Sequence, residues 1–416
     1  MQKVTVLGAG AAGLAVAAQL KTRGVDSVVL ERGPGVATSW RGRYDRLRLH
    51  TTRRLSGLPG MPIPRSYGRW VRRDDLVHYL EAYAGNFGLD VRTGTTVQRI
   101  LPADGRWTLK LGDGDGDGDG DGDGDGGSGS GSGSNGANGG SDSNGGGSNG
   151  SGGGSGSNGG GELTTDILIV ATGYLHTPLV PRWPGLEDWT GTLVHSSQYR
   201  NAEPFKDKHM LVAGVGNSGA EIATDLAEGG AASVTIAIRT PPHIVRREVG
   251  GWPAQMNGVL LGRLPARVFD PVAATMARLE VPDLRPYGIQ RPTVGLMTRH
   301  RTSRYVPLQD VGIVRDVMAR RVRPVAAVRS FTATSVQLAD GSTVEPDALI
   351  AATGYTSGLR ELFQDPSLLD ETGVPLVHGG PPARPGLYFT GYDVNLGGML
   401  RQAGIEAVRI ARRLAS

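Results

Sequence analysis

The chain has 416 residues, enough for two or three domains, and a formal net charge of +4. This positive surplus is small and dispersed, which argues against a nucleic-acid partner but suits a protein that handles phosphates. The sequence has no cysteine, which excludes disulfides, thiolate metal sites, dithiol redox chemistry and any cofactor attached through cysteine.

The first 32 residues predict a strand, a helix and a second strand. Residues 4–7 are an apolar run, 14–20 have small residues at helical spacing, and 28–30 form another apolar run. This apolar start differs from a signal peptide because glycines interrupt its centre and its charged flank is a single lysine. No later run reaches the roughly 18–20 apolar residues of a membrane span, so we expect a cytoplasmic protein without a membrane partner.

The turn between the first strand and the helix reads Gly8-Ala9-Gly10-Ala11-Ala12-Gly13, a dinucleotide-binding pattern. In this pattern the first glycine permits the tight turn, the second lets the backbone approach a pyrophosphate, and the third lets helix and strand pack closely. The pyrophosphate lies at the helix N-terminus, where free amides favour negative charge. Glu31 ends the second strand, where a carboxylate can accept ribose hydroxyls.

The next part of the chain mixes loops with a helix predicted at 74–84, for which Asp74 could be the N-cap. A hairpin strand is predicted at 106–111. The stretch 112–161 that follows is nearly all Gly, Ser, Asn and Asp, and such a composition cannot bury enough apolar surface to fold. Its Asp-Gly repeats lack the apolar residue of calcium-binding repeats, so we interpret it as a disordered insertion. A buried strand is predicted at 166–171.

From residue 210 the chain repeats its opening plan, with a strand at 210–213, a helix at 218–228 and a strand at 233–238. The glycine turn is now Gly214-Val215-Gly216-Asn217-Ser218-Gly219. The second strand ends at Arg239 instead of an acidic residue. A carboxylate would repel a 2′-phosphate, whereas a guanidinium can bind it bidentately. The first site therefore predicts FAD and the second NADPH, with a solvated strand-end charge as the alternative for Arg239.

Two further strands are duplicated: Val170-Ala171-Thr172-Gly173-Tyr174 and Ala351-Ala352-Thr353-Gly354-Tyr355 each end a buried strand. Strands near 324–337 and 348–352 and a C-terminal helix at 396–414 complete the expected elements.

This organisation predicts an α/β fold with two Rossmann-like dinucleotide-binding domains, one inserted in the other. We expect an FAD-binding domain formed by 1–176 and 346–416, with the insertion at 112–161, and an NADPH-binding domain at 177–345.

These residues resemble the class B flavin-dependent monooxygenases, and most closely their YUCCA-type branch with its bacterial relatives. The resemblance covers nearly the whole chain except 112–161. The matching pieces are Glu31-Arg32, Trp40, Tyr44-Asp45-Arg46-Leu47-Arg48-Leu49-His50, Tyr79-Leu80-Glu81-Ala82-Tyr83, Gly216-Asn217-Ser218-Gly219 and Asp310-Val311-Gly312.

The family's identifying pattern, F-x-G-x-x-x-H-x-x-x-F/Y, is present from Trp189 to Tyr199, with Trp in place of the usual Phe. In the family this segment lies near the link between the two nucleotide domains. The resemblance therefore implies a positioning role for His195 rather than proton transfer.

The resemblance also implies the reaction. NADPH reduces FAD, and the reduced flavin activates O2 as a C4a-(hydro)peroxide that oxygenates a small organic substrate. N- or S-oxygenation, Baeyer–Villiger insertion and oxidative decarboxylation of a 2-oxo acid all use this scaffold. No Ser/His/Asp motif, H-E-x-x-H motif or metal-ligand cluster is found among the eight histidines, so we expect no metal.

Two residues are catalytic candidates. His50 occupies the position near the flavin where YUCCA-type enzymes carry His, with a packed loop histidine as the alternative. Asn217 could donate toward the nicotinamide or simply satisfy its turn. The residues expected to bind the cofactors are Gly8, Gly10, Ala11, Ala12, Gly13, Glu31, Arg32, Trp40, His50, Thr172, Gly173, Gly214, Gly216, Asn217, Ser218, Gly219, Arg239, Gly391 and Asp393. Asp393 is alternatively an N-cap of the last helix.

Arginines at 285, 291 and 299–304 could face the cleft and bind a carboxylate substrate; a solvated loop or contacts to the NADPH phosphate are the alternatives. We expect the catalytic centre where flavin, nicotinamide and residues 285–305 meet. Two other functions stay open: an NADPH-dependent flavoprotein reductase that inserts no oxygen, and a non-catalytic FAD/NADPH redox sensor.

Overall fold

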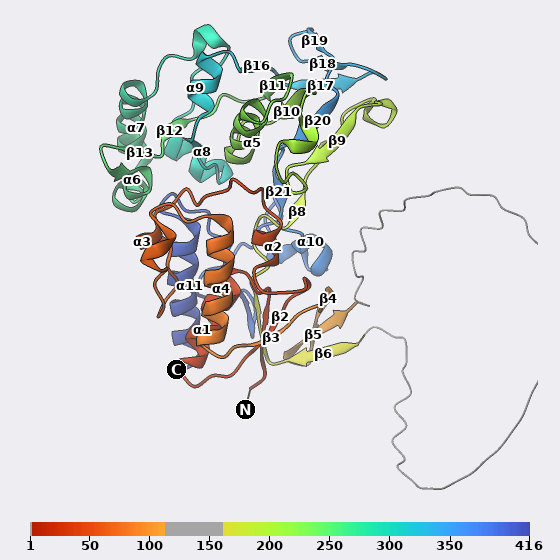
Figure 1. Cartoon of the computed structure of the whole chain (residues 1–416). Helices are drawn as coiled ribbons and strands as arrows, with labels where there is room; N and C mark the ends of the chain where they lie inside the picture. Colours follow the sequence, from red (N-terminus) through yellow and green to blue (C-terminus); the bar gives the residue numbers. More distant parts are fainter. Residues whose placement is uncertain (1, 113–160) are drawn as a thin grey trace, which may run out of the picture.

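The computed structural model describes residues 2–112 and 161–416, and the chain forms two halves stacked one above the other (Figure 1). Most of the insertion expected at 112–161 lies outside the described residues. Each half is built on a five-stranded parallel sheet, as two repeated strand–helix–strand units require.

The first half combines the beginning and the end of the chain. Its sheet has the order β22 (Leu387–Phe389), β7 (Ile167–Val170), β1 (Val4–Leu7), β2 (Val28–Leu30) and β3 (Asp90–Arg92). The small residues of α1 (Ala11–Lys21) let it pack closely on α11 (Met399–Leu414) and α4 (Arg73–Asn86). The core between these helices and the sheet is apolar, with Val6, Leu14 and Val29 fully buried.

The second half repeats this plan. Its sheet has the order β16 (Val322–Ala326), β11 (Ser233–Ile238), β10 (His209–Ala213), β20 (Ala348–Ala351) and β9 (Thr192–His195). Helices α5 (Asn217–Glu228) and α9 (Ile313–Met318) pack together beside this sheet. A helical segment, α6 (Ala254–Leu261), α7 (Ala266–Glu280) and α8 (Leu296–Ser303), is inserted between paired strands β12 (Ile244–Arg246) and β15 (Leu308–Asp310).

Smaller elements complete the two halves. One antiparallel sheet contains β4 (Val97–Ala103), β5 (Arg106–Leu111) and β6 (Glu162–Thr165), and another contains β17 (Val328–Phe331), β18 (Val336–Leu338) and β19 (Thr343–Val344). β13 (Glu248–Val249) pairs with β14 (Trp252–Pro253). Short helices are α2 (Thr38–Arg41), α3 (Arg53–Ser56) and α10 (Leu359–Leu362).

The chain crosses between the halves at β8 (Thr177–Pro178) and β21 (Tyr355–Thr356), which pair antiparallel. β20 pairs with β10 and β9, so it belongs to the second sheet and not to the first. The boundary expected at 345 therefore falls one strand too early. The reason is that β7 and β20 look alike in sequence but are the corresponding strands of different sheets. The pairing favours a second domain that runs from 177 to about 356.

Candidate active site

The first glycine turn lies at the carboxyl edge of the first sheet, between β1 and α1. Gly8 has a φ of 107°, and a methyl group there would lie 2.8 Å from the carbonyl oxygen of Ala171. A methyl group on Gly13 would collide with the carbonyl of Gly8. A methyl group on Gly10 would meet nothing within 4 Å. Two glycines are therefore required by packing, and the third leaves open space for a ligand at the helix N-terminus.

The second turn, between β10 and α5, has the same construction. Gly214 has a φ of 112° and lies against the carbonyl of Ala352, and a methyl group on Gly219 would collide with Gly214. A methyl group on Gly216 would meet nothing within 4 Å. Both turns thus fit a dinucleotide pyrophosphate by the same steric criterion.

Glu31 follows β2 and faces the first turn. Its carboxylate accepts hydrogen bonds from the backbone amides of Ala9 (2.8 Å) and Gly33 (3.0 Å). A carboxylate has about four acceptor positions, so both oxygens keep capacity for the hydroxyls of a ribose. These contacts fix the acid beside the space in front of Gly10.

A cavity of about 610 Å³ joins the two turns. Its walls include Gly10 and Gly216 from the open positions of the turns, together with His50. Other walls come from the strand-end segments, with Thr172, Gly173, Gly354 and Gly391. The cavity therefore contacts both expected nucleotide sites, which is the arrangement that hydride transfer between two cofactors requires.

One side of this cavity is apolar and is supplied largely by the inserted helices. It includes Leu261, Phe269, Val272, Ala273, Met276 and Leu296. Its cations are Arg43, Arg48 and Arg246. Arg43 donates to the hydroxyl of Tyr355 (2.5 Å), and Arg48 donates to the carbonyl of Trp70 (3.3 Å). The guanidinium of Arg246 makes no hydrogen bond or ion pair with any residue that the structure describes.

The arginines that could have faced the cleft do not line the cavity. Arg299 donates to the carbonyl of Pro241 (2.8 Å) and stacks on Tyr305, while Arg301 donates to the carbonyl of Leu264 (3.0 Å). Arg304 pairs with Asp370 (2.6 Å). Arg285 pairs with Asp283 (2.7 Å), and Arg291 is exposed outside the cavity. Of residues 285–305 only Leu296 lines the cavity. These contacts exclude a basic cleft built from these arginines and agree with the alternative of a charged loop whose side chains bind neighbouring protein groups.

Asn217 begins α5, and both ends of its amide are engaged by the protein. Its oxygen accepts from the amide of Gln309 (2.8 Å), and its nitrogen donates to the carbonyl of Pro307 (3.3 Å). This arrangement supports the interpretation that Asn217 secures the turn and the start of β15, rather than donating to a nicotinamide.

His195 and Tyr199 of the family-like pattern belong to the second half and bind other groups within it. His195 Nε2 lies 3.1 Å from the carbonyl oxygen of Gly354, and its Nδ1 lies 2.9 Å from the hydroxyl of Ser197. Burial lowers the pKa of His195, which favours the neutral ring. Tyr199 donates to Asp225 on α5 (2.7 Å). The positioning role that we expected for His195 agrees with these contacts.

The remaining predicted residues are more peripheral. Arg32 and Arg239 are exposed, and Arg239 follows β11 at the carboxyl edge of the second sheet. Trp40 lies on α2, is half-buried and lines the cavity. Asp393 follows the Gly391 turn and is half-buried, but it is not among the cavity-lining residues and does not cap α11, whose N-cap is Gly398.

Sequence reasoning missed two buried residues beside this site. Gln255 on α6 accepts from the amide of Thr52 (2.8 Å) and donates to the carbonyl of Gly397 (2.8 Å), and thereby joins the inserted helices to two loops of the first half. Glu221 on α5 lies 2.8 Å from His50. The only sequence signal for Glu221 was its position one helical turn after Asn217.

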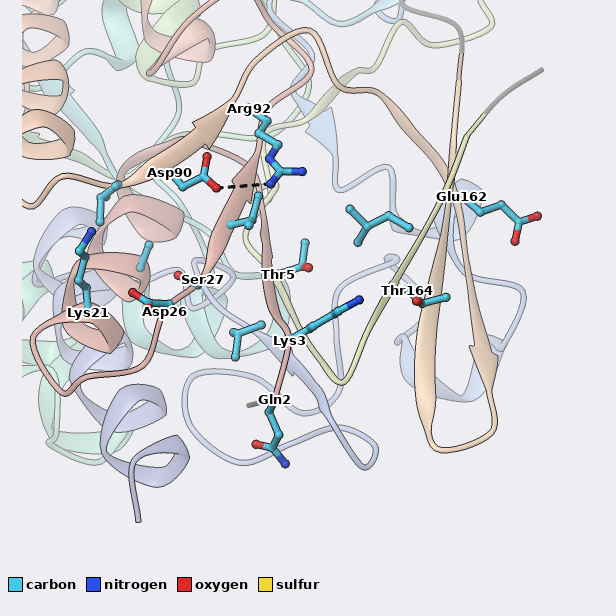
Figure 2. Close-up of a pocket in the computed structure, with 15 residues that line it drawn as sticks. Gln2, Lys3, Thr5, Lys21, Asp26, Ser27, Asp90, Arg92, Glu162 and Thr164 are labelled. Carbon is cyan, nitrogen blue, oxygen red and sulfur yellow. Dashed lines mark ion pairs between the residues drawn. The ribbon is translucent and has the colours of Figure 1, made fainter. Parts of the chain in front are cut away.

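A second hollow, of about 700 Å³, lies at the opposite, amino edge of the first sheet. Figure 2 shows Lys3, Asp90, Arg92 and Glu162 around it, with Asp90 and Arg92 paired. Nucleotides bind beyond the carboxyl ends of parallel strands, so this hollow is on the wrong side of the sheet for a cofactor. The cavity between the halves, which reaches both glycine turns, is therefore the expected cofactor site. No helix in the described part of the chain is long and apolar enough to cross a membrane.

Comparison with known proteins agrees with this geometry. Residues 161–375 match the flavin-binding monooxygenase-like family, and residues 5–114 match the pyridine nucleotide-disulphide oxidoreductase family. Indole-3-pyruvate monooxygenase YUCCA1 of Oryza sativa subsp. japonica is 32% identical over 394 residues, which cover 93% of this chain and 86% of that protein. The probable indole-3-pyruvate monooxygenase YUCCA3 of Arabidopsis thaliana is 29% identical over 417 residues, covering 99% and 86%.

Solved structures confirm the two-domain Rossmann-like fold. The flavin-containing monooxygenase of Stenotrophomonas maltophilia superposes with a TM-score of 0.67 at 22% identity, covering 100% of this chain and 97% of that chain. A cyclohexanone monooxygenase superposes with a TM-score of 0.65 at 17% identity, covering 100% and 88%. The expected fold, cofactors and class of reaction are confirmed. The chain belongs to the flavin-binding monooxygenase-like family, and it is an FAD- and NADPH-dependent oxidoreductase that oxygenates small substrates.

Proposed function

We propose that this monooxygenase acts on a small, largely apolar substrate that carries a carboxylate, with an aromatic 2-oxo acid as the first candidate. The observation that carries the proposal is the cavity itself, whose lining combines an apolar wall from α6 and α7 with the guanidinium of Arg246. Arg246 makes no direct ion pair with a described residue, although Glu280 of the same lining lies within its electrostatic reach. An apolar pocket with a few placed polar groups is the usual form of a small-molecule site. The names of the plant relatives, which specify indole-3-pyruvate, support the same substrate class.

We propose that FAD is held by the first glycine turn and by Glu31, Arg32, Trp40, Thr172, Gly173, Gly391 and Asp393. We propose that NADPH is held by the second glycine turn and by Arg239. When bound, NADPH supplies the hydride and the reduced flavin supplies the electrons that activate O2. The protein orients both groups and keeps water from the reacting atoms. His50 lines the cavity and is proposed to contact the flavin side, whereas Asn217 is proposed to position β15.

The substrate class is tested by supplying four kinds of compound with NADPH and ¹⁸O₂: indole-3-pyruvate, a thioether, a tertiary amine and a cyclic ketone. We expect substrate-dependent NADPH oxidation and labelled product for the 2-oxo acid. Labelled product from a neutral compound alone would contradict the carboxylate proposal. NADPH oxidation that reduces a quinone or yields only hydrogen peroxide, without labelled product in any of the four, would favour the reductase alternative.

Arg246→Ala tests the proposed carboxylate partner. Removal of this cation should raise KM for the 2-oxo acid about tenfold, since hydrogen bonds to charged groups contribute about 1.5–3 kcal/mol. The kinetics of flavin reduction by NADPH should not change. Arg291→Ala is the matched control, because Arg291 is exposed and does not line the cavity. An equal effect of the two substitutions would show that only general charge matters.

Arg239→Ala tests the proposed 2′-phosphate contact. Loss of a bidentate guanidinium should weaken NADPH binding about tenfold or more and leave NADH binding unchanged, because only NADPH carries that phosphate. The measurement is the dissociation constant of each nucleotide from anaerobic flavin reduction, with Arg329→Ala as the exposed control. Equal weakening of both nucleotides would assign Arg239 another role.

A further inference from the structure

Helix α5 presents an acidic stripe on one face. Glu221, Asp225 and Glu228 are spaced four and three residues apart, which places them on one side of the helix, one turn after another. The same helix begins at the second glycine turn, and Figure 1 shows it in the lower part of the upper half, near the other half. The stripe therefore follows the helix that the NADPH turn starts.

A single loop of the first half, residues 44–50, meets this stripe. Arg46 lies 3.2 Å from Asp225 and 2.9 Å from Glu228. His50 Nε2 lies 2.8 Å from Oε1 of Glu221. Asp225 also accepts from Tyr199, the last residue of the family-like pattern. All three carboxylates of the stripe thus contact the same loop, and we call this set of contacts the α5 clamp.

Glu221 is the buried member of the clamp. Its side chain is 5% exposed, whereas those of Asp225 and Glu228 are 20% and 38% exposed. Burial, and next the charge of Glu221, raise the pKa of Tyr44, so the hydroxyl of Tyr44 stays protonated beside the acid. Arg247 also lies within the electrostatic reach of Glu221.

Burial of a carboxylate at position 221 costs desolvation free energy and so disfavours folding. Its Oε1 is 2.8 Å from Nε2 of His50 but is not aligned for a hydrogen bond with it, and Nδ1 of His50 and the hydroxyl of Thr224 have no hydrogen-bond partner among the described residues. Replacement of a buried charge by an apolar group of similar size is often neutral or stabilising. Folding stability alone therefore does not explain the acid at position 221.

The clamp connects the two cofactor sites. Glu221 is one turn from the open glycine turn of the second half, and His50 forms part of the wall of the common cavity. Fixing His50 against α5 therefore fixes the NADPH helix against the flavin side. Hydride transfer needs reacting atoms about 3–3.5 Å apart, and a misplacement of about 1 Å can cost about 10²-fold in rate.

We propose that Glu221 is a positioning residue for hydride transfer, which acts through His50 and, with Asp225 and Glu228, holds the NADPH helix at a fixed place relative to the flavin-side loop. This proposal rests on the assignment of the second glycine turn to NADPH. It concerns the separation of the halves, so one of its consequences can be measured without any nicotinamide.

The first test measures that separation in the enzyme with FAD bound. Because the chain has no cysteine, His78→Cys on α4 and Ala232→Cys before β11 would introduce two unique sites for spin labels, both exposed. Pulsed electron paramagnetic resonance should give a narrow distribution of distances between the two spin labels in the protein that carries only these two substitutions. Glu221→Gln should broaden or shift it, whereas Glu345→Gln, at an exposed glutamate outside the clamp, should not.

The second test measures anaerobic flavin reduction by NADPH in a stopped-flow instrument. Glu221→Gln should lower the limiting reduction rate about tenfold or more, with the dissociation constant of NADP⁺ changed less than about threefold. Glu221→Asp should restore part of the rate. The effects of Glu221→Gln and His50→Gln should be strongly non-additive, because they act through one contact.

The outcomes separate the two proposals. An unchanged distance distribution in Glu221→Gln overturns the clamp, whether the reduction rate falls or not. A changed distribution with an unchanged reduction rate overturns the role in hydride transfer. If Glu221→Gln does not fold, Arg46→Gln provides the same two readouts from the more exposed end. Failure of the NADPH assignment would instead leave NADP⁺ binding unaffected by Gly216→Ala, whatever the spin labels show.

Discussion

Gly216 and Gly219 lie three residues apart in one turn, yet an added methyl group would meet very different surroundings. At Gly219 it would collide with the carbonyl of Gly214, whereas at Gly216 it would meet nothing within 4 Å. The backbone of Gly216, with φ −78° and ψ −175°, is extended and suits an alanine. One glycine therefore serves packing, and the other serves the ligand.

This difference predicts opposite results for two alanine substitutions. Gly216→Ala should leave the unfolding temperature unchanged and weaken NADP⁺ binding about tenfold or more, because the methyl group occupies the path of the pyrophosphate. Gly219→Ala should lower the free energy of unfolding by about 1–3 kcal/mol, because the added methyl group forces α5 away from the turn that follows β10. Thermal unfolding and NADP⁺ titration check both, and a large stability loss in Gly216→Ala would contradict the assignment.

The partly buried His176 predicts how stability depends on pH. Burial, and next the charge of Arg32, lower the pKa of His176 to about 4. The unfolded chain, with a pKa near 6.5, therefore binds this proton more tightly than the folded one. The stability that the neutral ring permits is complete above about pH 6.5 and is lost as the pH falls toward 4.

His176→Gln should accordingly reduce the decline in unfolding temperature between pH 6.5 and 4.5. The measurement is thermal unfolding over a pH series, with His78→Gln as the control because His78 is exposed on α4. Identical pH profiles for the wild type and His176→Gln would show that His176 does not contribute.

Single residues were predictable where backbone geometry dictates them. The glycine turns follow from steric rules that any dinucleotide fold obeys. The partners of Arg299 and Arg304 were not predictable, because a run of arginines looks the same in sequence whether its side chains line a cleft or bind neighbouring protein groups. Glu221 was missed for a related reason: its partner His50 is far away in sequence, and no local sequence pattern indicates that a glutamate is buried.

At the scale of elements, the side chain of Gln255 joins α6 to the first half. Gln255 is 2% exposed and bonds to Thr52 and Gly397, and α6 approaches so closely that a methyl group on Gly258 would collide with Leu396. Since α6 and α7 supply the apolar wall of the cavity, this attachment determines how well the cavity excludes water.

Gln255→Leu should therefore loosen the wall. It leaves the Thr52 amide and the Gly397 carbonyl without partners, at a cost of about 1–3 kcal/mol for each buried group. We expect NADPH oxidation to continue, with a larger share of the electrons released as hydrogen peroxide, because water reaches the reacting atoms. Leu260→Ala, at an exposed residue of the same helix, is the control. An unchanged peroxide yield would mean that α6 does not seal the site.

The elements themselves divide in the same way. β1, α1 and β2, and β10, α5 and β11, were predicted nearly to their ends, because apolar periodicity and glycine turns act locally. The helices of the 254–303 segment were not resolved in advance. α7 contains Pro271 and Phe269 is its one buried residue, so its apolar face toward the cavity gives no core signal. The N-cap expected at Asp74 is instead Arg72, and Asp74 pairs with Arg73 (2.7 Å).

At the scale of the whole molecule, strand pairing decided what sequence could not. The duplicated strands β7 and β20 each continue into the same Thr-Gly-Tyr sequence, but β7 lies in the first sheet and β20 in the second. Sequence shows only that both strands are buried. Which sheet a buried strand joins depends on partners far away in the chain, so the domain boundary was displaced while the count of two domains was right.

The described residues on either side of 113–160 give the last prediction. β5 and β6 are antiparallel neighbours in which Lys110 pairs with Glu162, and the amide of Leu111 donates to the carbonyl of Gly161 (2.8 Å). The described residues that flank 113–160 thus pair with each other, on the small sheet outside both cofactor turns. A two-residue Asn-Gly turn closes such a hairpin without distorting its strands.

Replacement of 113–160 by Asn-Gly should therefore leave FAD content, the rate of flavin reduction and coupling to product unchanged, with an unfolding temperature at least that of the full chain. The reason is that the register of β5 and β6 is held by their own pairing, from Trp107↔Thr165 to Lys110↔Glu162. A variant with half of the segment, closed by the same turn, separates an effect of length from one of sequence. Loss of FAD or of coupling in both variants would assign the segment a direct part in the reaction.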